Sequence, residues 1–310
     1  MNEIPSFKRA LELLPVINEL LTRAVAPLLT WMPLTFPETV QLLMLSTAAA
    51  TVYRDVRDRR AFARQVPVPT AYGVKLMGHA GMEAGVFERE ETALARRLLQ
   101  ETDVFVDVGA NVGLYACLAR AARRTVIAVE PLQRNLDYLY ANLRANGFED
   151  VEVFPVGLAQ APGLATLFGG STGASLIRGW AGAPAPLART IPLSTLDTLL
   201  GDRFAGRRLL IKIDVEGAEL GVLRGAARTL ARVPAPTWLV EISRGELHPD
   251  RVNADRRAAF QLFDDAGYAA SAIDDPDRPI PIGADGPALA AGGGSDYLFS
   301  KDKGSINAGS

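Results

Sequence analysis

Residues 107–113 combine an acid, two glycines and an amide at a spacing suited to holding a ligand. The segment reads Asp-Val-Gly-Ala-Asn-Val-Gly and follows a short apolar run. Its glycines allow a sharp turn at the end of a strand and close approach of the backbone to a ligand. A helix follows, and the free N–H groups of its first turn attract a carboxylate or another anion. The G-x-G-x-x-G spacing of dinucleotide sites is absent, with Asn111 in its middle position, and Asp107 would repel a pyrophosphate but favour a cationic ligand.

A second acid, Glu130, ends the next apolar run, 17 residues after Gly113. A carboxylate at this place can accept hydrogen bonds from both hydroxyls of a ribose. Together with Asp107 on the preceding strand, it predicts an adenosine ligand that carries positive charge, and S-adenosylmethionine fits that description. The competing interpretation makes Asp107 a turn-capping carboxylate and Glu130 a solvated strand end.

These residues need a sheet to bring them together, and the chain from about residue 85 onward predicts one. Short β-branched runs alternate there with longer helical stretches, which is the pattern of a parallel sheet covered by helices. The predicted strands are 103–108, 125–130, 151–156, 208–214, 237–242 and a closing 296–300. The predicted helices lie near 112–123, 132–146, 217–231 and 254–266. We therefore expect an α/β fold with a doubly wound, mostly parallel, Rossmann-like sheet.

The segment between the third and fourth predicted strands does not repeat this alternation. It contains a predicted hairpin through Leu164–Phe168, a flexible stretch from Gly169 to Pro186, and a helix at 195–200 capped by Ser194. A Gly/Ala/Pro-rich segment of this length inside a compact domain is usually functional or disordered. We expect specificity for a substrate to reside here and in the N-terminal extension, with Trp180 either covering the substrate or packing in the core.

Residues 1–84 form a predicted helical extension. Residues 4–23 place apolar side chains on one helical face, and a second apolar helix is predicted from Thr35 onward. In one interpretation residues 24–64 pack on the main domain or on a sister subunit; in the other they contact a membrane surface. The longest uncharged run there, 39–53, has 15 residues, whereas a membrane-spanning helix needs about 20.

Composition narrows the choice of partners. The predicted main domain covers 85–302, and the polar tail 303–310 is expected to be disordered. Lys and Arg total 33 against 35 Asp and Glu, which gives a formal charge of −2. A chain with this balance lacks the overall positive potential that attracts nucleic acid. One cysteine and two histidines argue against an internal disulfide and against a Cys/His metal site. We expect a cytoplasmic enzyme, and the apolar 39–53 helix favours a homo-oligomer.

The motifs taken together resemble one known family. The sequences DVGANVG at 107–113, AVEP at 128–131, KIDVEGAE at 212–219 and WLVEIS at 238–243 are similar to the FkbM family of S-adenosylmethionine-dependent methyltransferases. The resemblance covers roughly 85–245 and extends to the closing strand. It implies a class I methyltransferase fold, S-adenosylmethionine as methyl donor, and methyl transfer, typically to a hydroxyl oxygen of a sugar or secondary metabolite.

The resemblance also implies roles for individual residues. It assigns to the cofactor Asp107, Gly109, Ala110, Asn111 and Gly113 at the methionine moiety, Glu130 at the ribose, Gly157 and Gln160 at the adenine, and Asp214 beside the sulfonium. The candidates for a general base or substrate clamp are, in order, Asp214, Glu241, Glu216 and His248. No metal ligands are assigned, although carboxylates close together could bind a divalent cation that orients a diol.

One departure from the family leaves the base open. The fifth strand of the family commonly ends in Glu-x-His, whereas here Glu241 is followed by Ile242 and Ser243. His248 lies five positions later and is the residue that could fold back into the site. Two alternatives to an O-methyltransferase acting on a small hydroxylated molecule therefore stay open: a non-catalytic S-adenosylmethionine-binding scaffold, and a nicotinamide-dependent oxidoreductase.

Overall fold

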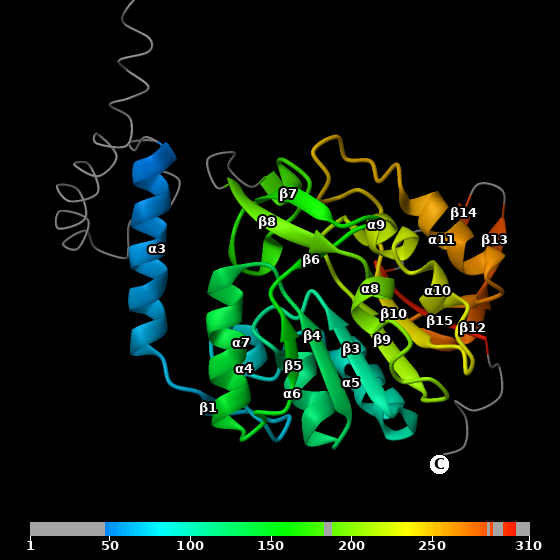
Figure 1. Ribbon diagram of the computed structural model, residues 1–310, viewed down its shortest axis with the longest axis horizontal. Coiled ribbons are helices and arrows are strands. Elements are labelled where there is room, and N and C mark those ends of the chain that lie inside the picture. Colours follow the sequence, from blue (N-terminus) through cyan, green and yellow to red (C-terminus); the bar gives the residue numbers. More distant parts are fainter. Residues whose placement is uncertain (1–46, 183–187, 284–285, 288–293, 302–310) are drawn as a thin grey trace, which may run out of the picture. The chain divides into compact units, whose positions relative to one another are not determined.

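The computed structural model describes residues 47–182, 188–283, 286–287 and 294–301, with only the backbone described for 47–55, 171, 283 and 286–287. The predicted helices before residue 47 and the predicted tail 303–310 lie outside the described residues. The chain divides into two compact units, Met1–Gln65 and Val66–Ser310. The described part of the first unit is one helix, α3 (Thr47–Arg64), which ends in a basic last turn (Figure 1).

The second unit is built on an eight-stranded sheet with the order β12-β11-β15-β10-β9-β3-β4-β5 (Figure 1). In that order its strands are Asp275–Ile280, Ala269–Ala272, Asp296–Ser300, Thr237–Glu241, Leu209–Ile213, Val104–Val108, Thr125–Val129 and Glu152–Phe154. The strands from β10 to β5 are parallel, and β15, β11 and β12 pair antiparallel. The mostly parallel α/β sheet predicted from the sequence is confirmed.

The order of the strands reverses between β3 and β9. From β3 the chain builds β4 and β5 on one side, and it then returns to build β9 and β10 on the other side. Ligands of open parallel sheets bind outside the carboxyl ends of the strands at such a switch point. The segment 107–113 follows β3 directly, so the fold places it at this switch point.

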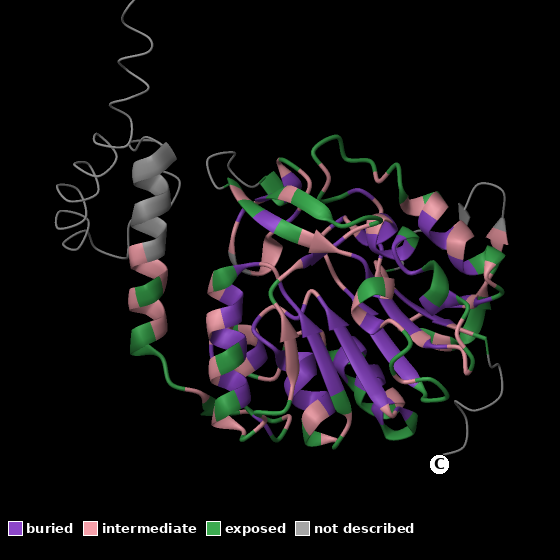
Figure 2. Ribbon diagram, viewed as in Figure 1, coloured by how far each residue is buried: buried purple, intermediate pink, exposed green. Residues whose placement is uncertain are grey.

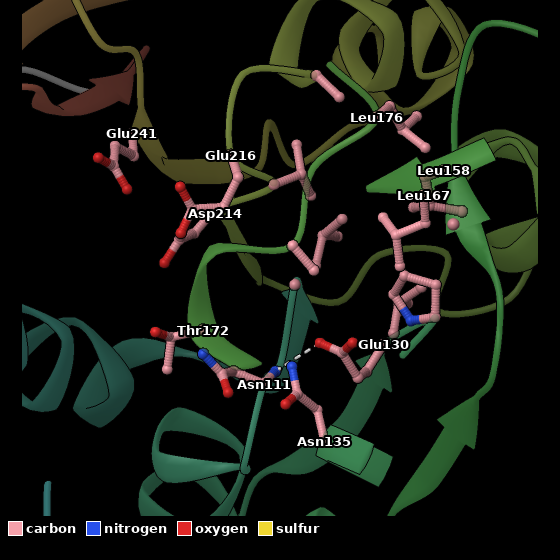
Figure 3. A pocket seen from close by; sticks show the side chains of 18 of the residues that line it. Asn111, Glu130, Asn135, Leu158, Leu167, Thr172, Leu176, Asp214, Glu216 and Glu241 are labelled. Atoms are coloured by element: carbon pink, nitrogen blue, oxygen red, sulfur yellow. Dashed lines mark hydrogen bonds between the residues drawn. The ribbon is translucent and has the colours of Figure 1, made fainter. Parts of the chain in front are cut away.

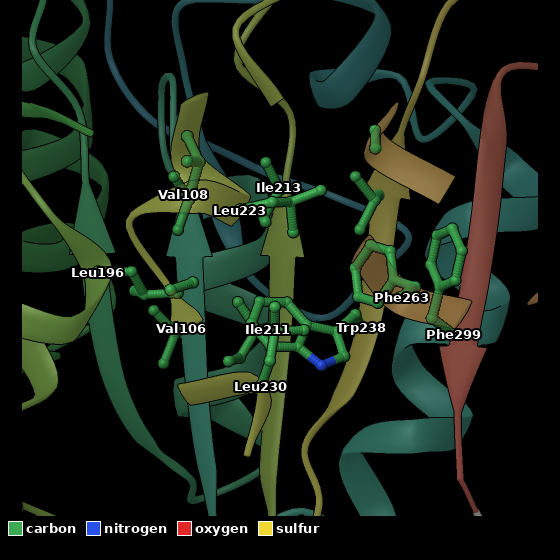
Figure 4. Packing of buried hydrophobic residues seen from close by; sticks show 14 of the residues in the cluster. Val106, Val108, Leu196, Ile211, Ile213, Leu223, Leu230, Trp238, Phe263 and Phe299 are labelled. Atoms are coloured by element: carbon green, nitrogen blue, oxygen red, sulfur yellow. The ribbon is translucent and has the colours of Figure 1, made fainter. Parts of the chain in front are cut away.

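Helices cover both faces of the sheet because its central strands are apolar on both faces. The second unit contains the helices α4 (Ala80–Glu83), α5 (Arg89–Leu98), α6 (Leu114–Ala121), α7 (Gln133–Ala145), α8 (Leu196–Leu200), α9 (Glu219–Arg224), α10 (Ala227–Leu230) and α11 (Arg256–Asp265). Every residue of β3 and β9 is buried (Figure 2). On one face Val106, Ile211 and Trp238 pack against Leu223 and Phe263 of α9 and α11 (Figure 4). The other face of β3 and β4 contacts α6.

A smaller sheet lies after β5 in the chain. It has the order β6-β8-β7, with strands Gly157–Leu158, Ala188–Ser194 and Gly163–Phe168. The predicted strand at 164–168 is present, but it pairs antiparallel with the distant β8 rather than with a neighbouring segment. Short strand pairs complete the unit: β1 (Val68–Pro69) with β2 (Lys75–Leu76), and β13 (Ile282–Gly283) with β14 (Gly286–Pro287).

Three local predictions need correction. The cap of α8 is Thr195 rather than Ser194, since the Thr195 side chain accepts the Thr198 N–H. The predicted helix 217–231 is two short helices, α9 and α10, and Gly225 between them packs so closely on Ala159 that an added Cβ would lie 2.2 Å from the Ala159 carbonyl oxygen. The stretch after Gly169 is predicted to be flexible, but in its described part Ser175 and Trp180 form hydrogen bonds with Glu216. Residues 183–187 lie outside the described residues.

Candidate functional site

A cavity of about 260 Å³ opens at the carboxyl ends of β3, β4, β9 and β10. The side chains of Asn111, Glu130, Asp214, Glu216 and Glu241 line it, together with apolar residues from the smaller sheet (Figure 3). The sequence motifs at 107–113, 130 and 214–216, far apart in the chain, therefore meet at one place. The cavity is the candidate active site.

The turn after β3 fits closely between its two neighbours. Gly109 has φ +88°, and a Cβ there would lie 1.8 Å from the backbone oxygen of Asp214. The N–H groups of Gly109 and Ala110 donate to the Val129 carbonyl at 2.9 and 3.0 Å. Only glycine fits at 109. Because Gly109 has no side chain, its backbone itself lines the cavity.

The other glycine of the turn has a different task. Gly113 has φ +90°, and a Cβ there would lie 2.3 Å from Cδ1 of Leu139. Gly113 and Ala110 are not part of the cavity lining. The need for glycine at 113 arises from the packing of the start of α6 against α7, which supports the turn from behind.

Asp107 lies beneath the turn and not in the cavity lining. Its side chain is on the face of β3 that also carries Lys212 in the paired position of β9. It is 1% exposed, and its Oδ2 has no hydrogen-bond partner among the described residues. Burial raises the pKa of Asp107 to about 7, against the opposing charge of Lys212.

Glu130 faces the cavity from the end of β4. Its Oε2 accepts the Asn111 N–H at 2.9 Å (Figure 3), and its Oε1 accepts the Leu132 N–H at 2.8 Å. Burial raises the pKa of Glu130 to about 7, while these N–H groups lower it. Each carboxylate oxygen keeps a further lone pair, so two vicinal hydroxyls can bind here.

Apolar side chains form the wall next to Glu130. Leu158, Leu167 and Ile191 of the smaller sheet line the cavity beside Gly157. Gln160 is exposed and does not line it. The structure thus does not bring Gln160 to the adenine site that the resemblance implied. The apolar side chains of this wall could instead pack against the face of a planar base such as adenine.

Three carboxyl groups gather at the opposite end, from the ends of β9 and β10. Asp214, Glu216 and Glu241 lie near one another there (Figure 3). The buried Lys212 lies behind them, with Nζ 2.9 Å from Asp214 Oδ2 and 3.4 Å from Glu91 Oε1. No Lys, Arg or His occurs among the described residues that line the cavity. The cavity therefore suits a ligand with positive charge.

Glu216 is tied to the segment that was predicted to be flexible. Nε1 of the buried Trp180 donates to Glu216 Oε2 at 2.6 Å, and Ser175 Oγ donates to the Glu216 backbone oxygen at 2.6 Å. Burial and the charge of Asp214 raise the pKa of Glu216 to about 7. Of the two roles considered for Trp180, the structure shows packing.

Glu241 lines the cavity, whereas His248 does not. Burial and the charge of Asp214 raise the pKa of Glu241 to about 10. The ring of His248 packs edge-on against Trp180 at 4.7 Å. Burial lowers the pKa of His248. The imidazole of His248 therefore contacts Trp180, and Trp180 in turn donates a hydrogen bond to Glu216.

Sequence reasoning missed Glu88 and Thr172, which also line the cavity. Glu88 lies in the segment GVFEREE at 85–91, which the family resemblance covered without assigning a role. Within the described residues no group of three or more His, Cys, Asp or Glu could hold a metal ion. Of the helices that the structure describes, none is long and apolar enough to cross a membrane.

Several known proteins are similar to this chain. One is the hexuronic acid methyltransferase AglP of Haloferax volcanii, with 32% identity over an alignment of 163 positions that covers 47% of this chain and 60% of AglP. The chain thus spans less than two thirds of that relative. Similar solved structures include precorrin-6y C5,15-methyltransferase from Geobacter metallireducens GS-15, with 11% identity, a TM-score of 0.37, and coverage of 76% of this chain and 95% of that one.

A putative O-methyltransferase from Klebsiella pneumoniae is also similar, with 14% identity, a TM-score of 0.39, and coverage of 79% of this chain and 87% of that one. The sequence profile of the methyltransferase FkbM domain matches residues 107–269, more than half of the chain. The chain therefore belongs to the FkbM family of methyltransferases, with a class I fold and S-adenosylmethionine as its methyl donor.

Proposed function

We propose that the protein is an O-methyltransferase that acts on a hydroxyl group of a sugar or secondary-metabolite molecule. The observation that carries this proposal is the group of carboxyls formed by Asp214, Glu216 and Glu241 at one end of the cavity. Carboxyl groups can orient a hydroxyl and take its proton. S-adenosylmethionine supplies an activated methyl group, so the chain has to align the acceptor oxygen and remove its proton.

The residues of the cavity fit this cofactor. Gly109 leaves room for a close approach to the backbone, and Glu130 can accept hydrogen bonds from the ribose hydroxyls. Oδ1 of Asn111 is buried in the lining without a hydrogen-bond partner among the described residues. The apolar wall at Leu158 and Leu167 suits the adenine. The carboxylates of the lining favour the net positive charge of the cofactor.

Glu216 is the proposed general base. A base works best when its pKa lies near the working pH, and the pKa of Glu216 is raised to about 7. Asp214 already accepts a hydrogen bond from Lys212, so we assign it the role of clamp for the acceptor. Glu241, whose pKa is raised by burial and by the charge of Asp214, is placed to hydrogen-bond a neighbouring oxygen of the acceptor.

The name of the relative supports a sugar as the acceptor. AglP is a hexuronic acid methyltransferase, and a hexuronic acid is a sugar that carries both hydroxyl groups and a carboxylate. No residue of the described lining is cationic, so we propose a hydroxyl group of the sugar, rather than a carboxylate, as the methyl acceptor.

The test is methyl transfer from methyl-labelled S-adenosylmethionine to a panel of glycosides and hydroxylated aromatic compounds. With the acceptor found, the rate should rise as the pH passes upward through about 7, because Glu216 must lose its proton to act as a base. Glu216→Gln should lower the turnover number by about 10²–10⁴-fold and should abolish the rise of the rate with pH near 7. Glu149→Gln, an exposed glutamate far from the motifs in sequence, serves as the control.

A wild-type pH profile that stays flat between 6 and 8, or full activity of Glu216→Gln, would contradict the role of Glu216. Binding of the cofactor without turnover on any acceptor would instead favour the non-catalytic scaffold.

A further inference from the structure

Glu88 is the cavity acid that no family motif accounts for. It precedes α5 and lies outside the matched region 107–269, yet it lines the same cavity as Asp214 and Asn111. Its backbone adopts the left-handed conformation, with φ 42° and ψ 55°. A side chain at such a position costs free energy, and strained residues of this kind cluster at functional sites.

Contacts on two sides hold Glu88 in place. Tyr115 Oη, from the first turn of α6, donates to Glu88 Oε2 at 2.9 Å. The backbone oxygen of the preceding residue, Phe87, accepts a hydrogen bond from Tyr72 Oη at 3.2 Å. The Tyr115 ring in turn lies 4.7 Å from Lys212 Nζ. The carboxyl group is therefore oriented by α6, the helix that the turn after β3 begins.

The place of Glu88 in the cavity suits one part of the proposed cofactor. In the proposed function Glu130, which follows β4, would hold the ribose, and the carboxyl groups after β9 and β10 would hold the acceptor. The methionine moiety would then lie between them, beside the turn after β3. Asp107, the acid that the family resemblance assigns to this moiety, lies beneath the turn and outside the lining. Glu88 is the acid beside this turn that does face the cavity.

The charge balance at Glu88 favours a cation as its partner. Burial and the charge of Glu91 raise the pKa of Glu88 to about 9, and Lys212 only partly offsets this. An ammonium group brought into the cavity would supply the missing positive charge.

We propose that Glu88 is a cofactor-binding residue whose carboxylate accepts a hydrogen bond from the α-ammonium group of the methionine moiety. The inference rests on the proposed function only in that S-adenosylmethionine occupies this cavity. Tyr115 is a positioning residue for Glu88.

The test is a thermodynamic cycle of binding measurements on the full chain. Calorimetry gives Kd for S-adenosylhomocysteine and for its analogue without the α-amino group, with the wild type and with Glu88→Gln. Competition against S-adenosylhomocysteine extends the range for the weaker analogue. The wild type should bind the deaminated analogue about 10- to 100-fold more weakly, the value of a charge-assisted hydrogen bond. Glu88→Gln should bind S-adenosylhomocysteine more weakly by a similar factor and should no longer distinguish the two ligands.

Two further variants guard against a merely structural effect. Glu90 is an exposed residue in the first turn of α5, the helix that Glu88 precedes, and Glu90→Gln should behave as the wild type. Tyr115→Phe should lose part of the discrimination between the ligands. If Glu88→Gln still discriminates between the ligands as strongly as the wild type, the inference is overturned. A wild type that binds neither ligand would contradict the proposed cofactor site itself, and the inference with it.

Discussion

At the scale of single residues, steric contact at Gly109 explains why the turn after β3 has its sequence. A Cβ at this position would overlap the Asp214 backbone oxygen, which lies 1.8 Å away. That oxygen belongs to the loop that carries the proposed clamp and base. The shape of the cofactor turn and the position of the acceptor residues are thus coupled through one glycine.

Gly109→Ala should therefore cost about 3 kcal/mol or more in the free energy of unfolding, from steric overlap added to backbone strain. Gly147→Ala is the matched control: it too has positive φ, +71°, but nothing lies within 4 Å of its added Cβ. It should cost only about 1 kcal/mol, the strain alone. Urea unfolding of both variants measures the difference, and equal losses would contradict the steric argument.

Sequence reasoning at this scale could select the residues of continuous motifs, but it could not place residues whose position depends on the fold. Glu130 and Asp214 line the cavity because each follows a strand whose carboxyl end faces the site. Asp107 belongs to another motif of the same predicted site, yet its place within β3 puts its side chain on the face shared with Lys212, outside the lining. Gln160 and His248 sit on loops whose paths no local pattern encodes, so their exclusion from the lining could not be foreseen.

At the scale of elements, the segment after β7 acts as a support for Glu216. Its Trp180 side chain is buried and donates to Glu216 Oε2. That hydrogen bond lowers the pKa of Glu216 and opposes the effect of burial. The packing also requires a glycine next to Glu216, since a Cβ at Gly217 would lie 2.5 Å from the Trp180 ring.

Trp180→Phe should therefore move the ionisation of Glu216 to a pH above about 7. Carbon NMR of labelled glutamate side chains can follow this titration without any knowledge of the acceptor, with Glu216→Gln to assign the signal. Trp238→Phe, at a similarly buried tryptophan in the core of the main sheet, controls for the loss of packing. An unchanged or lowered Glu216 titration in Trp180→Phe would show that the hydrogen bond does not act on the base.

The main strands were predictable because buried parallel strands appear as continuous β-branched runs. The smaller sheet was predictable only in part. The partner of β7 is β8, which follows it only after a long intervening segment, and no local pattern encodes that pairing. Gly225, between α9 and α10, likewise packs against a segment distant in sequence, at Ala159. Such contacts between distant segments cannot be deduced from local propensity.

At the scale of the whole molecule, the structure groups Val66–Ser310 into one compact unit, whereas the main domain predicted from the sequence starts at residue 85. Residues 66–84 belong to it through specific contacts. Asn142 of α7 exchanges two hydrogen bonds with the backbone of Met77, at 2.9 and 3.0 Å. Leu76 and Met82 are buried within the same unit. For residues 1–65 we propose a role as a contact between subunits or with a membrane surface.

A chain comprising 66–310 should accordingly unfold in one cooperative transition, with a midpoint close to that of the full chain. A chain comprising 85–310 exposes the site vacated by Leu76 and leaves Asn142 without these partners, so its midpoint should fall clearly. Calorimetry or circular dichroism measures the three transitions, and light scattering compares their masses. Equal midpoints for the two shortened chains would contradict this boundary. A full chain no larger in mass than a monomer would contradict the proposed homo-oligomer.

The most direct test of the central claim is a calorimetric titration of the full chain with S-adenosylmethionine and S-adenosylhomocysteine, beside Glu130→Ala. We expect the wild type to bind both with Kd on the order of micromolar, and the variant to lose this binding because the ribose hydroxyls lose their acceptor. Glu149→Ala should bind like the wild type, and thermal unfolding should show that both variants are folded. Absence of binding by the wild type, or unchanged binding by a folded Glu130→Ala variant, would contradict the assignment of this cavity to the cofactor.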